Sequence, residues 1–212
     1  MRPIRQTLSS SNLLLMGVPK KFHNLCIGDF DTYGEDDLTK VRAYISNYLD
    51  NIPTMFENNQ GLFMYGSNGV GKTFLASMIV IEAYRNRYSA RRVTFSEYIT
   101  RYTQMWGAKT PDEKEMLEDV FYNNYKAVEF LVLEELGKEL DTKLSAPVLE
   151  DLLRYREDHS LVTIICANIP PSEIKDRYGA SVASLLKGNM TPILIEGRDK
   201  RQEYYNERLN EF

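Results

Sequence analysis

The sequence predicts an α/β domain in which a parallel five-stranded sheet lies between layers of helices. Short apolar runs of strand length alternate along the chain with longer segments of helical apolar spacing, and this alternation is typical of a parallel sheet. Two of the runs, at residues 130–133 and 161–165, are nearly continuous, as expected of strands that are covered on both faces. With 43% hydrophobic and 26% charged residues in 212, the composition is that of one packed domain.

The predicted elements follow one another in a simple order. We expect strands at residues 62–65, 93–95, 130–133, 161–165 and 192–195. We expect helices at residues 35–50, 74–88, 96–106, 112–125 and 142–156, and a helical end from residue 198. The chain then divides into residues 1–16, a short tail that is either flexible or bound to a partner, and residues 17–212, a single domain without a large C-terminal lid.

Composition and charge exclude several classes of protein. No run approaches the roughly 18 apolar residues of a membrane helix, and the start lacks a signal-peptide core, so we expect a cytoplasmic protein with no membrane partner. Two cysteines and two histidines cannot supply a four-ligand zinc site or a disulfide framework. The net charge of −4 excludes a polycation, although basic residues gather in 1–28 and 82–109, where a polyanion should approach.

A glycine-rich motif follows the first predicted strand. Gly66, four further residues, and then Gly71, Lys72 and Thr73 form the phosphate-binding pattern GxxxxGK[ST]. Its place between a strand and a helix lets backbone N–H groups and the helix dipole meet phosphate oxygens. We expect Lys72 to reach the β- and γ-phosphates of ATP or ADP and the Thr73 hydroxyl to bind Mg²⁺. The alternative is a glycine-rich turn with a solvated lysine. The predicted nucleotide-binding loop comprises Gly66, Ser67, Asn68, Gly69, Val70, Gly71, Lys72 and Thr73.

Polar residues follow two later strands. Glu134 and Glu135 come after the run at 130–133, in the Walker B pattern, so we expect Glu134 to bind Mg²⁺ and Glu135 to polarise the attacking water. The first acid is normally aspartate, and the longer Glu134 predicts a looser or water-mediated contact with the metal. Asn168 follows the next strand, where its amide could orient water or touch the γ-phosphate. The alternatives are two surface glutamates and an ordinary turn former.

Together these motifs resemble the AAA+ ATPases of the DnaC/DnaI helicase-loader and IstB transposition-helper group. The likeness lies in GVPKKF at 17–22, GSNGVGKT at 66–73, FLVLEELG at 130–137, TIICAN at 163–168 and GRDKR at 197–201. It implies ATP binding, assembly into homo-oligomers, contact with single-stranded DNA, and a replicative helicase or a transposase as partner. It also implies that residues around Lys21, Phe22, Ile27 and Phe30 border the adenine and that Arg201 is the sensor II arginine.

One departure from the resemblance concerns hydrolysis. Leu185 stands where the family carries an arginine finger, a residue that typically adds about 10³ to 10⁵ to the rate. We therefore expect slow turnover unless Arg154, Arg156 or Arg177 of a neighbouring subunit replaces the finger.

A segment between the second and third predicted strands interleaves aromatic and basic residues. Aromatic rings stack on bases and cations follow phosphates, which favours contact with single-stranded DNA. The aromatic residues also recur with helical spacing, so the core face of a helix is an equal alternative. The candidate DNA-binding residues are Tyr98, Arg101, Tyr102, Trp106 and Lys109.

These observations favour an ATP-switched helicase loader or replication-initiation accessory with weak ATPase activity. The alternative of a different class is a loader-like interaction protein that recruits or sequesters a replication or transposition partner without hydrolysis. A third hypothesis is a small-molecule kinase, but this activity would need a basic lid that binds the phosphate acceptor, and the sequence does not reveal one.

Overall fold

The computed structural model describes residues 8–139 and 143–199. A five-stranded sheet runs through its centre, and every neighbouring pair of strands is parallel, in the order β2-β3-β4-β1-β5. The fold class and all five strands expected from the sequence are confirmed. The strands are β1 (Gly61–Tyr65), β2 (Ala90–Thr94), β3 (Phe130–Leu136), β4 (Val162–Ala167) and β5 (Met190–Leu194).

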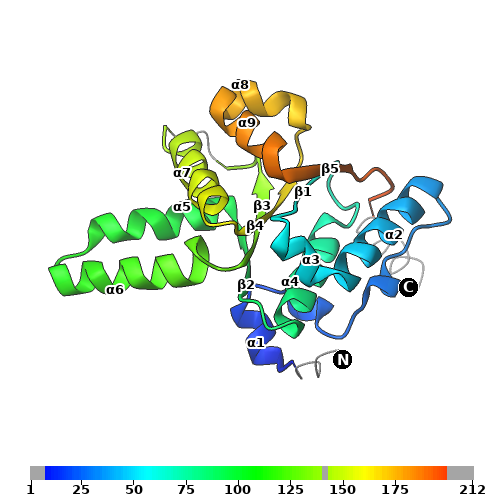
Figure 1. Cartoon of the computed structure of the whole chain (residues 1–212), viewed down its shortest axis with the longest axis horizontal. Helices are drawn as coiled ribbons and strands as arrows, with labels where there is room; N and C mark the ends of the chain where they lie inside the picture. Colours follow the sequence, from blue (N-terminus) through cyan, green and yellow to red (C-terminus); the bar gives the residue numbers. More distant parts are fainter. Residues whose placement is uncertain (1–7, 140–142, 200–212) are drawn as a thin grey trace, which may run out of the picture.

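Helices cover both faces of the sheet (Figure 1). One face carries α1 (Ser10–Leu15), α2 (Asp36–Asp50), α3 (Ile52–Glu57) and α4 (Lys72–Arg85). The other carries α5 (Phe95–Gln104), α6 (Pro111–Phe121), α7 (Ser145–Asp158), α8 (Ile174–Tyr178) and α9 (Ala180–Asn189). Short helical turns lie at Lys20–Phe22, Ile27–Asp29, Met105–Gly107, Tyr122–Lys126 and Pro171–Glu173.

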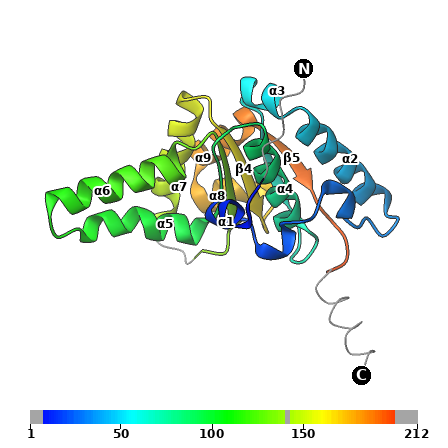
Figure 2. The same cartoon turned by 90° about the horizontal axis from the view of Figure 1, so that it is seen from below.

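The sheet separates two hydrophobic cores. Successive residues of a strand point to opposite faces, so Phe130 and Val132 join the core under α4 while Leu131 and Leu133 join the core under α7. This double burial explains the nearly continuous apolar run of β3. The α5–α6 hairpin extends away from the sheet, as Figure 2 shows from below.

Local signals explain where the predicted helices begin. The Thr94 hydroxyl caps α5 by accepting a hydrogen bond from the backbone N–H of Glu97, and Thr110 caps α6 in the same way. Pro111 occupies the first turn of α6, where its missing N–H costs nothing. Among the described residues, no helix is long and apolar enough to cross a membrane.

The N-terminal segment differs from the prediction of a separate tail over residues 1–16. Residues 10–15 form α1, and Leu13 and Met16 are buried in the core beneath α4. Leu13 and Met16 thus pack as part of the domain, whereas Leu14 and Leu15 on the other side of the helix are exposed. Helices α3, α8 and α9 were also not expected.

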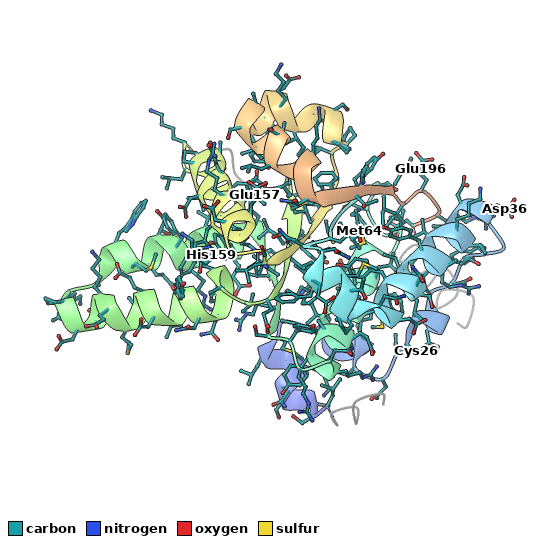
Figure 3. The ribbon with its side chains drawn as sticks, in the orientation of Figure 1. Cys26, Asp36, Met64, Glu157, His159 and Glu196 are labelled. Carbon is teal, nitrogen blue, oxygen red and sulfur yellow. The ribbon has the colours of Figure 1, made fainter. Side chains whose placement is uncertain are left out.

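The segment after β5 lies against the start of α2. Glu196 and Asp36 mark the two segments in Figure 3, and Arg198 Nε lies 4.0 Å from Glu35 Oε1. Most of the helix expected from residue 198 lies outside the described residues.

Candidate nucleotide-binding site

The predicted site residues meet at the carboxyl ends of β1, β3 and β4. Parallel strands end at the same edge of a sheet, and ligands of open α/β folds bind there. A cavity of about 820 Å³ lies at this edge. The predicted residues that line it are Phe22, Phe30, Asn68, Gly69, Gly71, Lys72, Thr73, Glu134, Glu135 and Asn168. Residues of the phosphate loop, both glutamates and the amide thus face one space.

The phosphate loop has the backbone shape that its glycines permit. Gly71 has φ 107° and precedes Lys72, the first residue of α4. A Cβ at Gly71 would lie 2.6 Å from Phe30 Cε2, so only glycine fits between the loop and this ring. Lys72 Nζ donates hydrogen bonds to the carbonyl oxygens of Gly66 (2.8 Å) and Ser67 (2.6 Å), which folds the ammonium group back over the loop.

Glu134 is a buried carboxylate, and one of its two oxygens has no hydrogen-bond donor among the described residues. Its side chain is 2% exposed, and Oε2 accepts a hydrogen bond from Arg92 Nη2 of β2. The other oxygen, Oε1, is buried, and no group within the described ranges donates to it. A buried carboxylate oxygen without a partner is costly. Glu134 and Thr73 both line the cavity, and carboxylate and hydroxyl oxygens are ligands that Mg²⁺ accepts. These residues therefore fit the metal.

Glu135 sits at an irregularity of β3. The pairing of β3 with β4 shifts register between Leu133 and Leu136, and Glu135 has φ 60°. The left-handed region costs a non-glycine residue about 1 to 2 kcal/mol. The side chain is half exposed, and Lys138 Nζ donates to its Oε1 at 3.3 Å. Backbone strain of this kind clusters at functional sites, and here it turns the carboxylate to the cavity edge.

A buried glutamate that the sequence analysis missed anchors the turn after β3. Glu139 accepts hydrogen bonds from the Gly137 backbone N–H (2.8 Å) and from the Tyr178 hydroxyl, and Arg177 lies 3.7 Å away. Burial, together with the hydrogen bond to Glu139, raises the pKa of Tyr178, so the hydroxyl stays protonated and keeps donating. The hydrogen bond between Glu139 and Tyr178 connects the segment that follows Glu135 to α8.

An aromatic wall closes the other side of the cavity. Phe74 lies between Phe22 and Phe30, with ring centroids 5.5 Å and 5.8 Å away. Ile27, expected to border the adenine, packs against the core instead and does not line the cavity. It lies in a short helical turn, which the sequence pattern did not reveal.

Further residues of the cavity wall were not expected from the sequence. They are Leu25, Asp29, Asp31, Phe74, Lys138 and Cys166, while Lys21, which the resemblance places near the adenine, also lines the cavity. Burial raises the pKa of the Cys166 thiol well above its ordinary value, so the thiol is neutral.

Arg201, the expected sensor II arginine, lies outside the described residues. The segment that leads to it does reach the phosphate loop. A Cβ at Gly69 would lie 1.8 Å from Asp199 Oδ1, so this carboxylate touches the loop backbone.

The candidate substitutes for an arginine finger differ sharply in exposure. Leu185 packs against the core beneath α7. Arg156 is 1% exposed and fully engaged inside the domain, so the proposal that it reaches a neighbouring subunit was wrong. Arg154 is 56% exposed and bonds Glu150, while Arg177 is paired with Glu139.

The candidate DNA-binding residues separate into two groups. Tyr98 is 1% exposed and its ring lies 5.0 Å from that of Phe121, so it belongs to the core and cannot stack on a base. Trp106 is 59% exposed at the end of the hairpin, with the half-buried Tyr102 ring 5.5 Å away. Arg101 and Lys109 are also exposed. Only the second group remains available to a partner.

A curated protein is similar in sequence to this chain. No protein-family model matches the chain. The replicative helicase loader DnaI of Bacillus subtilis (strain 168) is 29% identical over 155 residues, which cover 67% of this chain and 48% of the relative. The chain thus spans about half the length of the curated relative that it matches.

Solved structures share the fold. The crystal structure of the DnaC helicase loader matches with a TM-score of 0.68 and 20% identity, over 84% of this chain and 100% of that one. The replication initiator DnaA, bound to AMPPCP and single-stranded DNA, matches with a TM-score of 0.68 and 18% identity, over 92% of this chain and 56% of that one. At these identities the likeness shows a common architecture.

Proposed function

We propose that this chain, a DnaC/DnaI-like AAA+ protein, binds ATP with Mg²⁺ and serves as a helicase loader or replication-initiation accessory. The observation that carries the proposal is the cavity of about 820 Å³, which is lined by the glycine-rich loop, by an aromatic wall and by Glu134, whose buried Oε1 has no donor among the described residues. This combination suits a nucleotide, whose base is apolar on its faces and whose phosphates are anionic.

Each part of the cavity wall has a role in this proposal. The loop N–H groups and Lys72 hold the phosphates, while Phe22 and Phe30 enclose the base. Thr73 and Glu134 would hold Mg²⁺, which neutralises charge on the phosphates. Glu135 and Asn168 stand at the cavity edge to orient the attacking water.

Hydrolysis is weak in this proposal, and nucleotide binding acts mainly as a switch. Leu185 is half-buried at the finger position, and the buried Arg156 cannot replace it. These observations also favour the second candidate function, a loader-like protein that recruits or sequesters its partner without hydrolysis. Turnover measured with the partner and single-stranded DNA distinguishes the two, because the second candidate binds nucleotide tightly with no turnover.

The partners follow from the relatives. We propose a replicative helicase, or a transposase, as the protein partner, single-stranded DNA at the hairpin end around Trp106, and assembly into homo-oligomers in the cytoplasm. The DnaI relative is a helicase loader and the DnaA structure contains single-stranded DNA, which supports these partners.

Nucleotide binding is tested by calorimetry with ATP and ADP, with Mg²⁺ and with EDTA. Lys72→Ala should lower the affinity for ATP at least about tenfold, because a charge-assisted contact with the phosphates is lost. Lys40→Ala, at an exposed lysine of α2, is the matched control and should bind as the wild type does. Absence of any heat with millimolar ATP and Mg²⁺ contradicts the proposal.

The loader role is tested with the purified replicative helicase of the host. We expect the wild type to retain the helicase on a column with ATP and Mg²⁺ and to release it without nucleotide. Lys72→Ala should lose this dependence. Nucleotide binding without retention of the helicase under any condition would contradict the loader role and leave the nucleotide site standing.

A further inference from the structure

Arg92 of β2 connects the metal side of the cavity to the N-terminal segment. Its Nη2 donates to Glu134 Oε2, and its Nη1 donates to the carbonyl oxygen of Gly17 at 2.8 Å. Its backbone N–H donates to the carbonyl oxygen of Met16 at 2.8 Å. Arg92 thus binds both the Walker B carboxylate and residues 16–17, although Gly17 lies 75 positions away from it in sequence.

The contact with residues 16–17 is close and specific. β2 is an edge strand of the sheet, and the N-terminal segment covers part of its free edge. Gly17 has φ 80°, and a Cβ there would lie 2.1 Å from the carbonyl oxygen of Arg92. A residue with a side chain would hold the two segments apart. The contact therefore depends on glycine at this position.

The same segment continues into the base side of the cavity. Val18 is buried, and its carbonyl oxygen lies 3.0 Å from His23 Nε2. Lys21 and Phe22, which follow within four residues, line the cavity. A displacement of Gly17 would therefore be transmitted to the wall around Phe22 over a few residues of packed chain.

We infer that Arg92 is a positioning residue that couples cation binding at Glu134 to the placement of residues 16–22. Glu134 lines the cavity and accepts a hydrogen bond from Arg92 at Oε2, while its buried Oε1 has no donor among the described residues, so one carboxylate can hold both the guanidinium and a metal ion. A cation at Oε1 draws negative charge from Oε2 and repels the guanidinium, which weakens the hold of Arg92 on both partners. By linkage, Arg92 lowers the affinity of the cation to the same extent.

The inference also accounts for glutamate at the position where the resembled family has aspartate. Glu134 contacts Arg92 with one oxygen, and its other oxygen is buried with no donor among the described residues, in a side chain that lines the cavity. An aspartate is one methylene shorter, so its two oxygens are less able to reach both Arg92 and a cation in the cavity. The inference rests on the proposed function, since the cation considered is the Mg²⁺ that accompanies the nucleotide.

Arg91 provides a matched control. It precedes Arg92 on β2, is likewise half-buried, and points to the opposite face of the sheet. Its Nη2 donates to the Tyr125 hydroxyl at 2.8 Å, and its guanidinium lies 4.4 Å from the centroid of that ring. Replacing it removes an arginine from the same strand without touching Glu134 or Gly17.

The experiment measures ADP affinity by calorimetry, with Mg²⁺ and with EDTA, for the wild type, Arg92→Gln, Arg92→Lys and Arg91→Gln. The affinity for ADP with Mg²⁺, divided by the affinity with EDTA, gives the Mg²⁺ ratio. This ratio should be about fivefold higher in Arg92→Gln than in the wild type, because the positive charge that competes with the cation is removed. Arg91→Gln should leave this ratio within about twofold of the wild type. Arg92→Lys keeps the charge, so its ratio should also stay close to that of the wild type.

Hydrogen exchange of the backbone amides at residues 13–22 supplies the second measurement. In the wild type and Arg91→Gln, exchange should rise when ADP and Mg²⁺ bind. In both Arg92 variants it should be high without ligand and unresponsive to it, because neither side chain can bridge Gly17 and Glu134.

An unchanged or lowered Mg²⁺ ratio in Arg92→Gln overturns the inference, as does equal exchange in the wild type with and without ligand. If Arg92→Gln does not fold, the exchange pattern of Arg92→Lys decides. A wild type that binds no nucleotide contradicts the proposed function, whereas a wild type that binds nucleotide without these effects contradicts only the coupling by Arg92.

Discussion

A buried charged side chain lies on each face of the sheet, Glu134 on one and Arg156 on the other, and these two charges are satisfied to different degrees. On the α4 face, Glu134 has one oxygen on Arg92 and one without a donor within the described chain. On the α7 face, Arg156 uses all five of its N–H groups. Its acceptors are the Thr163 hydroxyl and the carbonyl oxygens of Lys126, Val128, Glu129 and Val162.

The difference distinguishes a charge that stabilises the fold from one that we propose binds a ligand. Burial lowers the pKa of Arg156 to about 9, so the side chain still carries its charge at neutral pH. Its hydrogen bonds join α7 to the segment just before β3 and to β4, in the core on this side of the sheet. Glu134 instead borders the cavity, and its Oε1 accepts no hydrogen bond from the described residues. A half-satisfied buried charge beside a cavity marks a binding site, whereas a fully satisfied one holds the fold together.

The largest effect is expected from Arg156→Met. The substitution leaves several buried carbonyl oxygens without donors and should lower the free energy of unfolding by about 3 to 5 kcal/mol. Urea unfolding followed by circular dichroism measures this. Arg154→Met, two residues along the same helix at an exposed site, should cost less than about 1 kcal/mol. Equal costs for the two variants would show that the buried network contributes little.

Glu134→Gln should have a smaller effect on stability and a larger one on binding. The amide keeps the shape and an acceptor for Arg92, so we expect a loss of about 1 kcal/mol in unfolding free energy. The gain in nucleotide affinity that Mg²⁺ confers should largely vanish, because the carboxylate charge is removed. Calorimetry with Mg²⁺ and with EDTA measures it. A variant with the full Mg²⁺ effect would place the metal elsewhere.

Glu135→Gly should stabilise the protein. Glycine adopts φ 60° without strain, so the free energy of unfolding should rise by about 0.5 to 1 kcal/mol, while any ATPase activity is lost. Glu135→Ala is the matched control, since it removes the carboxylate and keeps the strain. Thermal unfolding and phosphate release measure the two effects. Equal stability of the two variants would show that the backbone there is not strained.

The smallest effect on stability is expected from Trp106→Ala. The ring is mostly exposed, so unfolding free energy should change by less than about 1 kcal/mol. Affinity for single-stranded DNA should fall by about 1 to 3 kcal/mol, the usual contribution of a stacked base. Fluorescence anisotropy with a labelled oligonucleotide measures it. Tyr44→Ala, at an exposed ring of α2, is the control. Unchanged DNA affinity would remove the hairpin from the proposed DNA surface.

Local sequence patterns predict much of the fold and the positions of the candidate site residues. Apolar runs located all five strands, and the spacing of Gly66, Gly71 and Lys72 predicted a phosphate-binding loop between a strand and a helix, where a glycine-rich loop does join β1 to α4. The ends of β3 and β4 placed both glutamates and Asn168 at one edge. The positions of these strands and loops were predictable because the period of a strand and the chemistry of a turn are properties of a few consecutive residues. The binding roles of the residues at this edge stay predictions.

Tertiary structure alone decided which polar groups are satisfied. Arg92 and Glu134 are 42 residues apart, and only the pairing of β2 with β3 brings them together. The buried face of Tyr98, the register shift at Glu135 and the acceptors around Arg156 likewise depend on which element packs where. A sequence states which residues are charged or apolar, but the free energy of a buried charge depends on partners that the assembled sheet selects.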